Sequence, residues 1–264
     1  MGLFSTLFGK KKIQGRNKNV FYAQQDELMK QASLDAQTNF KYFWRELYWE
    51  QRRIVPAHDF AMVKVPFQQK FSREKETLVE HMWVNNISFN GEVITGELVN
   101  QPNRLTNVDK GDIVTRKIDE IGDWMISIKG KTYGGFTIQV MRSGMNDQER
   151  EHHDTTWGLD FGDYNEVLLV YEQKEKPENL AEHPMSKNMT EKMSEFLKDN
   201  PEELTIIDDD GLSLLHKEAI AGNKIGIKIL LEQGADKDIK SGSGKTALEY
   251  AEAMGWEHLI EVFE

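Results

Sequence analysis

A fixed offset of 33 residues runs through the C-terminal part of the chain. It separates four pairs of identical residues, namely Gly211 and Gly244, Gly222 and Gly255, Leu215 and Leu248, and Leu197 and Leu230. Glycine accepts the left-handed backbone that ends a helix, and leucine buries one helix against the next. A period of this length predicts stacked helical hairpins over residues 189–264.

The best-formed unit of this repeat covers residues 208–240. Leu215 and His216 stand where ankyrin repeats carry a Leu–His pair, and residues 234–236 match the turn that closes a repeat. The segment therefore resembles an ankyrin repeat, although Glu218 replaces an alanine of that family. We expect His216 to hold loop backbone. About two and a half units fit into the segment, fewer than the roughly three that make an array stable, so the array is expected to lean on the rest of the chain.

Residues 20–171 show a mixed pattern of helix and strand. Apolar residues recur every three or four positions over residues 24–54 and stop before Pro56, which predicts one long helix with an aromatic stripe. Short runs separated by turn residues follow, at 60–67 (closing near Pro66), 80–89, 93–99, 113–118, 124–128 and 167–171. The expected fold class is α+β. A long N-terminal helix packs on a curved antiparallel sheet, and an all-α ankyrin repeat domain follows.

Two local features of the strands can be predicted. Asn90-Gly91 lies between two apolar runs and suits a type I′ hairpin turn, which needs two positive φ angles. Alternation places Trp83, Ile87 and Phe89 on one side of the sheet. Beyond the sheet pattern, residues 133–141 are expected to open a short helix, and residues 146–154 a second one.

The charge distribution divides the chain further. Residues 1–19 hold five basic residues and no acid, and are expected to form a basic arm. Residues 172–188 are rich in Glu, Lys, Pro and Asn and are expected to be a linker between the domain over 20–171 and the repeats over 189–264. Residues 188–264 hold 17 acidic and 8 basic residues, so the repeats are acidic.

Composition excludes several classes of protein. The absence of cysteine rules out disulfides and thiolate chemistry. The net charge of −11 argues against nucleic acid as a partner and favours another protein with a basic patch. No apolar run approaches the length of a membrane span, and the apolar patch at the start precedes its lysines, so we expect a cytoplasmic protein.

Candidate site residues for a small ligand gather in a few motifs of the sheet domain. Gly134-Gly135 before a helix resembles an anion cradle, but the pattern of a phosphate loop is missing. The adjacent His152 and His153 point about 100° apart on a helix, so no metal site and no cofactor are expected there. The candidate binding residues are His81, Trp83, Asn100, Asp123, Trp124, Gly134 and Gly135. No catalytic residue and no enzyme signature are found.

Candidate residues for protein binding lie in the turns of the repeats. These are the acidic residues Asp208, Asp209, Asp210, Asp236 and Asp238. A different surface is offered by the N-terminal arm, where Leu3, Phe4, Leu7 and Phe8 precede a lysine run. That pattern is typical of a weak membrane-surface anchor, or of a frayed basic terminus.

Residues 40–171 resemble a bacterial family of uncharacterised proteins, the YegJ-like domain of unknown function. The segments that carry the resemblance are residues 43–46, 52–56, 63–67, 80–84, 96–102, 111–112, 121–125, 133–137 and 157–163. The family implies no reaction and no catalytic residues. It is similar to small domains that serve as immunity proteins beside secreted bacterial toxins, which implies a binding role.

Three functions are therefore open. The first is a bacterial protein-interaction module, in the form of an immunity or antitoxin protein that occludes a toxin. The second is a small-ligand-binding or hydrolytic domain with a pocket near His81 and Asp123. The third is a membrane-surface adaptor that uses the N-terminal arm.

Overall fold

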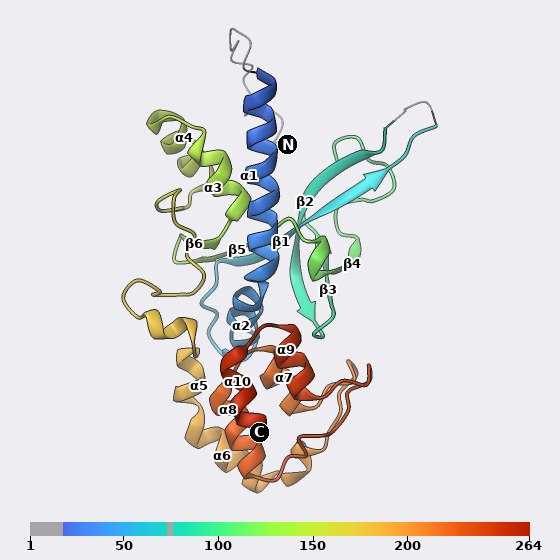
Figure 1. Cartoon of the computed structure of the whole chain (residues 1–264), viewed down its shortest axis with the longest axis vertical. Coiled ribbons are helices and arrows are strands. Elements are labelled where there is room, and N and C mark those ends of the chain that lie inside the picture. The colour runs from blue at the N-terminus through green and yellow to red at the C-terminus, as the bar shows by residue number, and fades with distance from the viewer. Residues whose placement is uncertain (1–17, 73–75) are drawn as a thin grey trace.

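The computed structural model describes residues 18–72 and 76–264, with side chains from residue 26 onward. The apolar and basic residues predicted as a membrane anchor lie outside this part of the chain. Figure 1 shows a long N-terminal helix in front of a twisted sheet, with the C-terminal helices gathered at the opposite end of the molecule.

The predicted single helix over residues 24–54 is wrong, because the chain forms two helices, α1 (Lys18–Thr38) and α2 (Phe40–Glu50). They are separated by Asn39, whose side-chain amide donates to the carbonyl of Asp35 at 2.9 Å. Such local side-chain bonds compete with helix continuation. The aromatic stripe is confirmed as core, since α2 buries Phe40, Phe43, Trp44, Tyr48 and Trp49.

Six antiparallel strands form one sheet in the order β4-β3-β2-β1-β5-β6. Their bounds are β1 (Phe60–Gln69), β2 (Leu78–Phe89), β3 (Val93–Leu98), β4 (Ile113–Lys117), β5 (Asp123–Ile128) and β6 (Lys131–Gly134). The antiparallel sheet is confirmed. The strand predicted at 167–171 is wrong, because only one backbone hydrogen bond, from Gly134 to the carbonyl of Leu168, joins that segment to β6.

β1 continues through Pro66, where the sequence predicted its end. β5 pairs with β1 only as far as Lys64, which lies opposite Asp123. The carbonyl of Lys64 faces the β5 side, where it accepts from the amide of Gly122, and Pro66 shares that orientation two residues on. The missing amide proton of proline therefore falls where β1 has no neighbour to bond.

The β2–β3 hairpin differs from its prediction in two ways. Gly91 has φ 88° but Asn90 has no positive φ, so the turn is not type I′; the Asn90 side chain instead accepts from the amides of Glu92 and Val93 at 3.0 Å. A β-bulge between Asn85 and Ser88 shifts the register of β2. Trp83 consequently lies in a small cluster apart from the main core, which holds Ile87 and Phe89.

The other helices of the described chain lie after the sheet, except for one short helix between two of its strands. They are η1 (Ile118–Glu120, between β4 and β5), α3 (Phe136–Ser143), α4 (Asp147–Trp157), η2 (Pro177–Leu180), α5 (Pro184–Asn188), α6 (Thr190–Asp199), η3 (Pro201–Leu204), α7 (Leu214–Ile220), α8 (Lys224–Glu232), α9 (Ala247–Ala253) and α10 (Glu257–Phe263). The helices expected near 141 and 146–154 are thus present, the first preceded by β6.

The 33-residue period appears as two helix pairs, α7–α8 and α9–α10. Their N-terminal capping boxes repeat at the same offset, with Ser213 and His216 in one and Thr246 and Glu249 in the other. The predicted role of His216 is confirmed. Its Nδ1 accepts from the amide of Ser213, and its Nε2 lies 3.0 Å from the carbonyl of Lys245.

The repeats lean on the rest of the chain, as their small number predicted. Buried Glu218 of α7 accepts hydrogen bonds from Tyr48 at 2.7 Å and from Arg52 at 2.8 Å, and its Oε2 accepts from Asn223 at 2.7 Å. The β2–β3 turn packs on α9, since a Cβ added to Gly91 would lie 2.6 Å from the Tyr250 ring. One apolar core runs from α2 and the sheet into these helices.

The segment expected as a linker is also packed. Buried Arg45 of α2 donates to the carbonyls of Asn179, Leu180 and Ala181. His183 is buried and stacks on Trp49 with ring centroids 5.6 Å apart. The segment thus joins the sheet and the repeats through buried contacts.

An ion pair at this junction should make stability depend on pH. The hydrogen bond from Lys245, 2.9 Å away, holds the pKa of Glu92 below its ordinary value. A lowered acid pKa contributes stability above the unfolded-state pKa, and this is lost as pH falls through the folded-state pKa. We expect Glu92→Gln to lower the free energy of unfolding by about 0.5 kcal/mol at pH 7, since both side chains are 39 % exposed.

Urea unfolding at several pH values measures this difference. The gap between the two proteins should close as the pH is lowered from 5 towards 2. Glu151→Gln, an exposed acid on α4, is the control and should match the parent protein throughout. A gap that stays constant down to pH 2 would assign the effect to something other than the ion pair.

Candidate functional site

Asp123 is the centre of the ligand site expected from the sequence. Its carboxylate is fully buried at the start of β5. Oδ1 accepts from the amides of Trp124 at 2.8 Å and Phe136 at 3.0 Å, while Oδ2 accepts from the amide of Thr137 at 2.8 Å and from its hydroxyl at 2.5 Å. Burial raises the pKa of Asp123, and the nearby Lys64 ammonium opposes that rise.

The glycine pair supports this arrangement. Gly134 and Gly135 both have φ 76°, and Gly135 is the N-cap of α3. The first amides of α3 point at the Asp123 carboxylate, so the anion at this helix N-terminus is a side chain of the chain itself. A Cβ on Gly134 would lie 2.3 Å from the Trp124 carbonyl oxygen, which shows that this glycine allows close backbone packing.

Lys64 and Thr137 complete the cluster, and neither is among the site residues predicted from the sequence. Lys64 Nζ donates to the Thr137 hydroxyl at 2.7 Å and lies 5.1 Å from the centre of the Trp83 ring. The Nδ1 atom of His81 is 3.4 Å from the Cβ that would be built on Gly122. Partial desolvation of its exposed side chain and the Lys64 ammonium lower the pKa of His81. The β1–β2 register places Lys64 opposite Trp83, and the β1–β5 register places it opposite Asp123. The sequence reveals neither register.

The other two expected site residues serve the scaffold. Asn100 accepts from the amide of Trp83 at 2.9 Å. Trp124 belongs to the main core on the opposite side, where its indole Nε1 donates to the carbonyl of Ala36 at 2.9 Å. The structure therefore brings His81, Trp83 and Asp123 together around Lys64 and places Trp124 away from them.

We expect Asp123→Ala to destabilise the protein by about 3 kcal/mol, because three amides and a hydroxyl lose their buried acceptor. Thermal melting of the purified variant tests this. His81→Ala is the control: its side chain is exposed, and its melting temperature should stay within about 2 °C of the parent. An Asp123→Ala protein with unchanged melting temperature would instead favour a ligand-binding role for the carboxylate.

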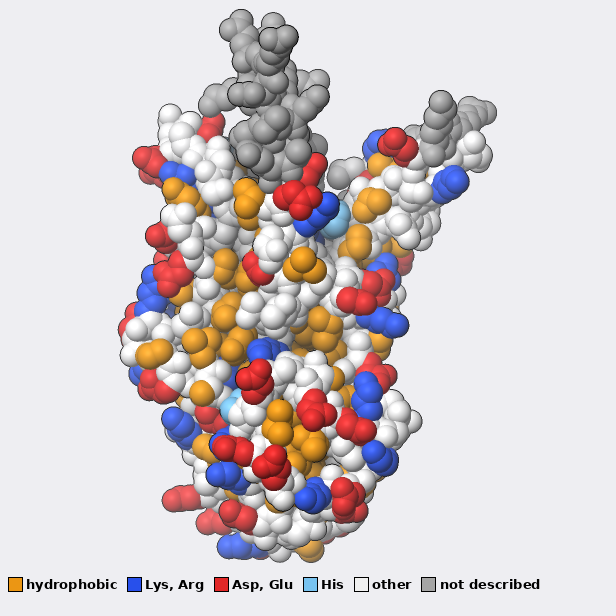
Figure 2. Space-filling model, viewed as in Figure 1, with side chains coloured by type: hydrophobic (Ala, Val, Ile, Leu, Met, Phe, Trp, Pro, Cys, Tyr) orange, Lys and Arg blue, Asp and Glu red, His pale blue; other side chains and the backbone are white. Residues whose placement is uncertain are grey.

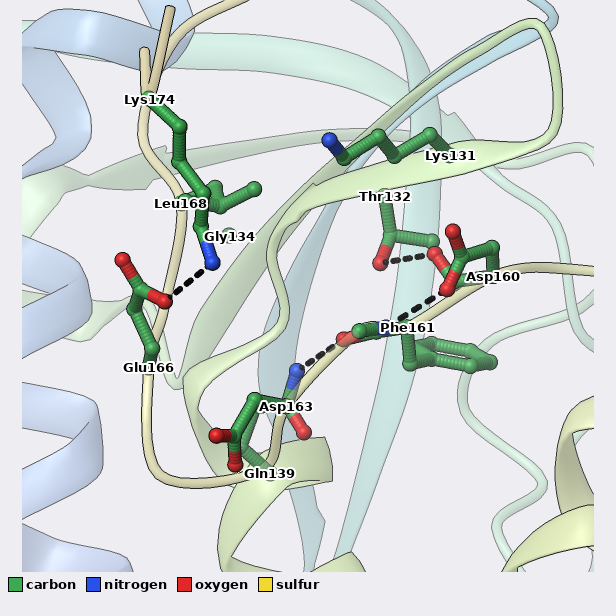
Figure 3. Close-up of a pocket in the computed structure, with 11 residues that line it drawn as sticks. Lys131, Thr132, Gly134, Gln139, Asp160, Phe161, Asp163, Glu166, Leu168 and Lys174 are labelled. Atoms are coloured by element: carbon green, nitrogen blue, oxygen red, sulfur yellow. Dashed lines mark hydrogen bonds and ion pairs between the residues drawn. The ribbon is translucent and has the colours of Figure 1, made fainter. Parts of the chain in front are cut away.

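A small pocket lies beside this cluster, along the outer edge of β6 (Figure 3). Its volume is about 140 Å³, and of the expected site residues it includes only Gly134. Lys174 and Glu166 form an ion pair of 2.6 Å at one wall, and the Gln139 amide donates to the Phe161 carbonyl at 2.7 Å. The pocket walls are thus held together by their own polar contacts.

The acidic turns of the repeats are more exposed. Asp209, Asp210, Asp236 and Asp238 are exposed, whereas Asp208 is partly buried and pairs with Lys217. Two basic neighbours are matched by acids, because Lys240 pairs with Glu249 at 3.1 Å and Lys245 with Glu92 at 2.9 Å, while Lys237 donates to the carbonyl of Phe263 at 2.7 Å. Within residues 18–72 and 76–264, no ion pair reaches the four exposed aspartates.

These turns lie close together in space. The amide of Gly242 donates to the carbonyl of Gly211 at 2.8 Å, so the loops before α7 and α9 stack on each other. Figure 2 shows acidic and basic side chains interspersed over the C-terminal helices, with apolar side chains between them. Unmatched negative charge is therefore present at these turns, although other exposed acids such as Glu195 and Glu252 also have no ion pair within the described residues.

The described part of the chain contains neither a membrane-spanning helix nor a cluster of metal ligands. Residues 18–72 and 76–264 contain no helix that combines the length and apolar character of a membrane span. The same residues contain no group of three or more His, Asp or Glu side chains placed to hold a metal ion.

The fold and these surfaces define an α+β sheet protein to which a short helical repeat is firmly joined. The chain belongs to the bacterial family described as "Uncharacterized protein conserved in bacteria (DUF2314)", whose profile matches residues 26–161. A protein of Neisseria meningitidis serogroup B, named as an ankyrin repeat protein, is 48 % identical over 246 residues, which cover 93 % of this chain and 96 % of that protein.

A second relative supports the resemblance seen in the sequence. The uncharacterized protein YegJ of Escherichia coli K12 is 36 % identical over 62 residues, which cover 24 % of this chain and 40 % of YegJ. No solved structure is significantly similar to the chain.

Proposed function

We propose that this chain is a protein-interaction module whose C-terminal helices are ankyrin repeats, and that it binds a basic partner through the acidic turns. The observation that carries the proposal is the set of four exposed aspartates that have no ion pair within residues 18–72 and 76–264, near Lys240 and Lys245, which already pair with other acids. Unmatched surface charge steers encounter with an oppositely charged protein and contributes to specificity.

The Neisseria relative supports this role through its name as an ankyrin repeat protein. The likeness of the sheet domain to immunity-type domains suggests the kind of partner, namely a bacterial toxin that the chain binds and occludes. The proposal includes no catalytic step. In support, the buried Asp123 carboxylate accepts four hydrogen bonds within the chain, as expected of a structural residue.

Neutralising the four aspartates should weaken partner binding. We expect the variant with Asn at positions 209, 210, 236 and 238 to lose about tenfold in affinity at low salt, since each exposed charge contributes a few tenths of a kcal/mol. A tagged full chain, purified from its own bacterium, recovers the partner, and calorimetry with the purified pair measures the affinity. The control variant neutralises four exposed acids elsewhere, Asp26, Asp119, Glu151 and Glu175, and should bind within twofold.

A growth competition tests the immunity role. A strain that lacks the gene should be inhibited by its parent strain, and the parent sequence should restore growth while the four-Asn variant restores it poorly. Loss of the gene without any sensitivity would exclude an immunity role, and equal affinity of the four-Asn and parent proteins would exclude the acidic turns.

A further inference from the structure

A cleft of about 240 Å³ opens where the sheet domain meets the repeats. Three separate parts of the chain form it: Trp44 and Tyr48 of α2, Ser88 and Phe89 at the end of β2, and residues 210–220 before and within α7. The buried Glu218 hydrogen bonds join α2 to α7, and the ring of Phe89 packs on Trp44, so the cleft walls are fixed relative to one another.

Three of the ten residues that line the cleft are aromatic. The rings of Trp44 and Phe89 meet edge to face with centroids 5.4 Å apart, and Trp44 and Tyr48 lie 6.3 Å apart. Leu212 and Ile220 contribute aliphatic surface from the repeat side. Rigid aromatic walls around a concave site are the usual setting in which one apolar side chain of a partner provides most of the binding energy.

Trp44 also has an unused polar group. Its indole Nε1 is buried and has no hydrogen-bond partner among the described residues, and the residue as a whole is only 7 % exposed. A buried indole N–H normally finds an acceptor. Trp49 and Trp124, in the same core, each have one. Trp44 thus lines the cleft with its ring, while its Nε1 is covered by the chain.

The rim of the cleft has a defined charge. Two of its bases are already matched, Arg52 by Glu218 at 2.8 Å and Lys217 by Asp208. Asp210 at the rim and its neighbour Asp209 have no ion pair in the part of the chain that the structure describes. The rim charge that remains available to a bound partner is therefore negative.

We propose that this cleft binds a segment of a partner protein that inserts one large apolar side chain, next to a lysine or arginine that pairs with Asp210. The inference rests on the proposed function, because it names the place and chemistry of the contact within the partner-binding role. It goes further in making the sheet domain, and not the repeats alone, part of the binding face.

Short peptides test the cleft on the full chain. The probe is a capped heptapeptide with one phenylalanine between two lysine pairs and glycine at each end. One control replaces its lysines by glutamates, and another replaces the phenylalanine by alanine. We expect the probe to bind at least tenfold more tightly than either control. In Ser88→Phe, where an exposed rim residue becomes large enough to fill the cleft, binding should be lost. Ser143→Phe, at the exposed end of α3, should bind normally.

Amide and indole NMR spectra provide the second readout. The Trp44 indole signal, identified by its absence in Trp44→Phe, should shift when the probe binds, because the bound phenylalanine ring lies beside the Trp44 ring that lines the cleft. Equal binding of the probe to the parent and Ser88→Phe proteins, or an unmoved Trp44 signal, would overturn the proposal. So would tight binding by a peptide of residues 1–16 alone, because the occupant would then be this chain's own apolar and basic arm.

The outcome separates this inference from the proposed function. If the four-Asn variant loses its partner while Ser88→Phe retains both probe and partner, the cleft is not the binding site but the acidic turns are. If the four-Asn variant binds its partner normally, the proposed function fails on its own test.

Discussion

Glu218→Ala is expected to destabilise the protein by about 3 kcal/mol, although the resemblance to ankyrin repeats would place alanine at this position. The buried carboxylate accepts from Tyr48, Arg52 and Asn223, and Tyr48 is itself buried. Removing one member of a buried charged network costs about 3–5 kcal/mol, and the lower end applies because the Arg52 side chain is 34 % exposed. For a chain of this size, a fall of roughly 6–10 °C in melting temperature follows.

Urea unfolding of parent and variant measures the loss directly. Glu232→Ala, an exposed acid on the neighbouring helix α8, is the matched control and should change the free energy of unfolding by less than about 0.5 kcal/mol. If Glu218→Ala unfolds within 1 kcal/mol of the parent, the junction is held by its apolar contacts alone and the hydrogen-bond network contributes little.

Gly134→Ala should be at least as harmful, for a different reason. Gly134 has φ 76°, and its added Cβ would lie 2.3 Å from the Trp124 carbonyl oxygen and 2.4 Å from the Trp124 ring. A left-handed backbone costs an alanine about 1–2 kcal/mol, and overpacking a rigid core adds about 1–3 kcal/mol. The two contributions sum to about 2–5 kcal/mol, and the upper part of this range applies because the added Cβ meets both the carbonyl oxygen and the ring. We expect a total loss of about 3–5 kcal/mol, measured by chemical unfolding, with part of the protein expressed as insoluble material.

Gly130→Ala separates the two contributions. Gly130 lies in the same β5–β6 hairpin with φ 77°, but nothing is within 4 Å of its added Cβ. Its substitution should cost only the backbone term, about 1 kcal/mol. Equal losses at both positions would show that the Trp124 ring moves aside, and that the packing around Gly134 is looser than the structure indicates.

Local signals in the sequence predicted much of the architecture. The 33-residue offset located two helix pairs, because the glycines and capping residues act within each unit. Alternating runs located five of the six strands, and the aromatic stripe correctly marked α2 as core. Each of these features depends on residues that are close in the chain, so a single sequence is enough to read them.

The structural predictions were wrong where residues distant in the sequence determine the local backbone. The bulge at Asn86, with φ 50°, reverses the side to which Trp83 points relative to Phe89, and alternation alone cannot reveal an extra residue. The expected strand at 167–171 has apolar residues that pack on the core, yet it lacks a partner for a hydrogen-bonded ladder. Likewise, Pro66 is tolerated because β5 begins opposite Lys64, which only the register shows.

The candidate site was predictable only in part. Asp123 and the glycine pair were singled out, but Lys64 and Thr137 reach them through strand pairing and through the start of α3. The cleft at the junction could not be anticipated either. Its walls come from residues more than 120 positions apart, Trp44 and Ser88 on one side and residues 210–220 on the other. Glu218 stands where ankyrin repeats carry alanine, and this difference is the signal in the sequence that the junction has an additional contact.

The Glu218 hydrogen bonds constrain how this chain can change by recombination. Tyr48 and Glu218 are 170 residues apart in sequence, so any exchange that replaces the C-terminal segment also replaces the acceptor on which α2 depends. Replacement of this segment by a repeat from an ankyrin protein would place alanine at position 218. Tyr48 and Arg52 would then have no carboxylate acceptor there. The two halves of the gene are therefore expected to be inherited together, and relatives that lost the repeats should also have lost the polar residues at the end of α2.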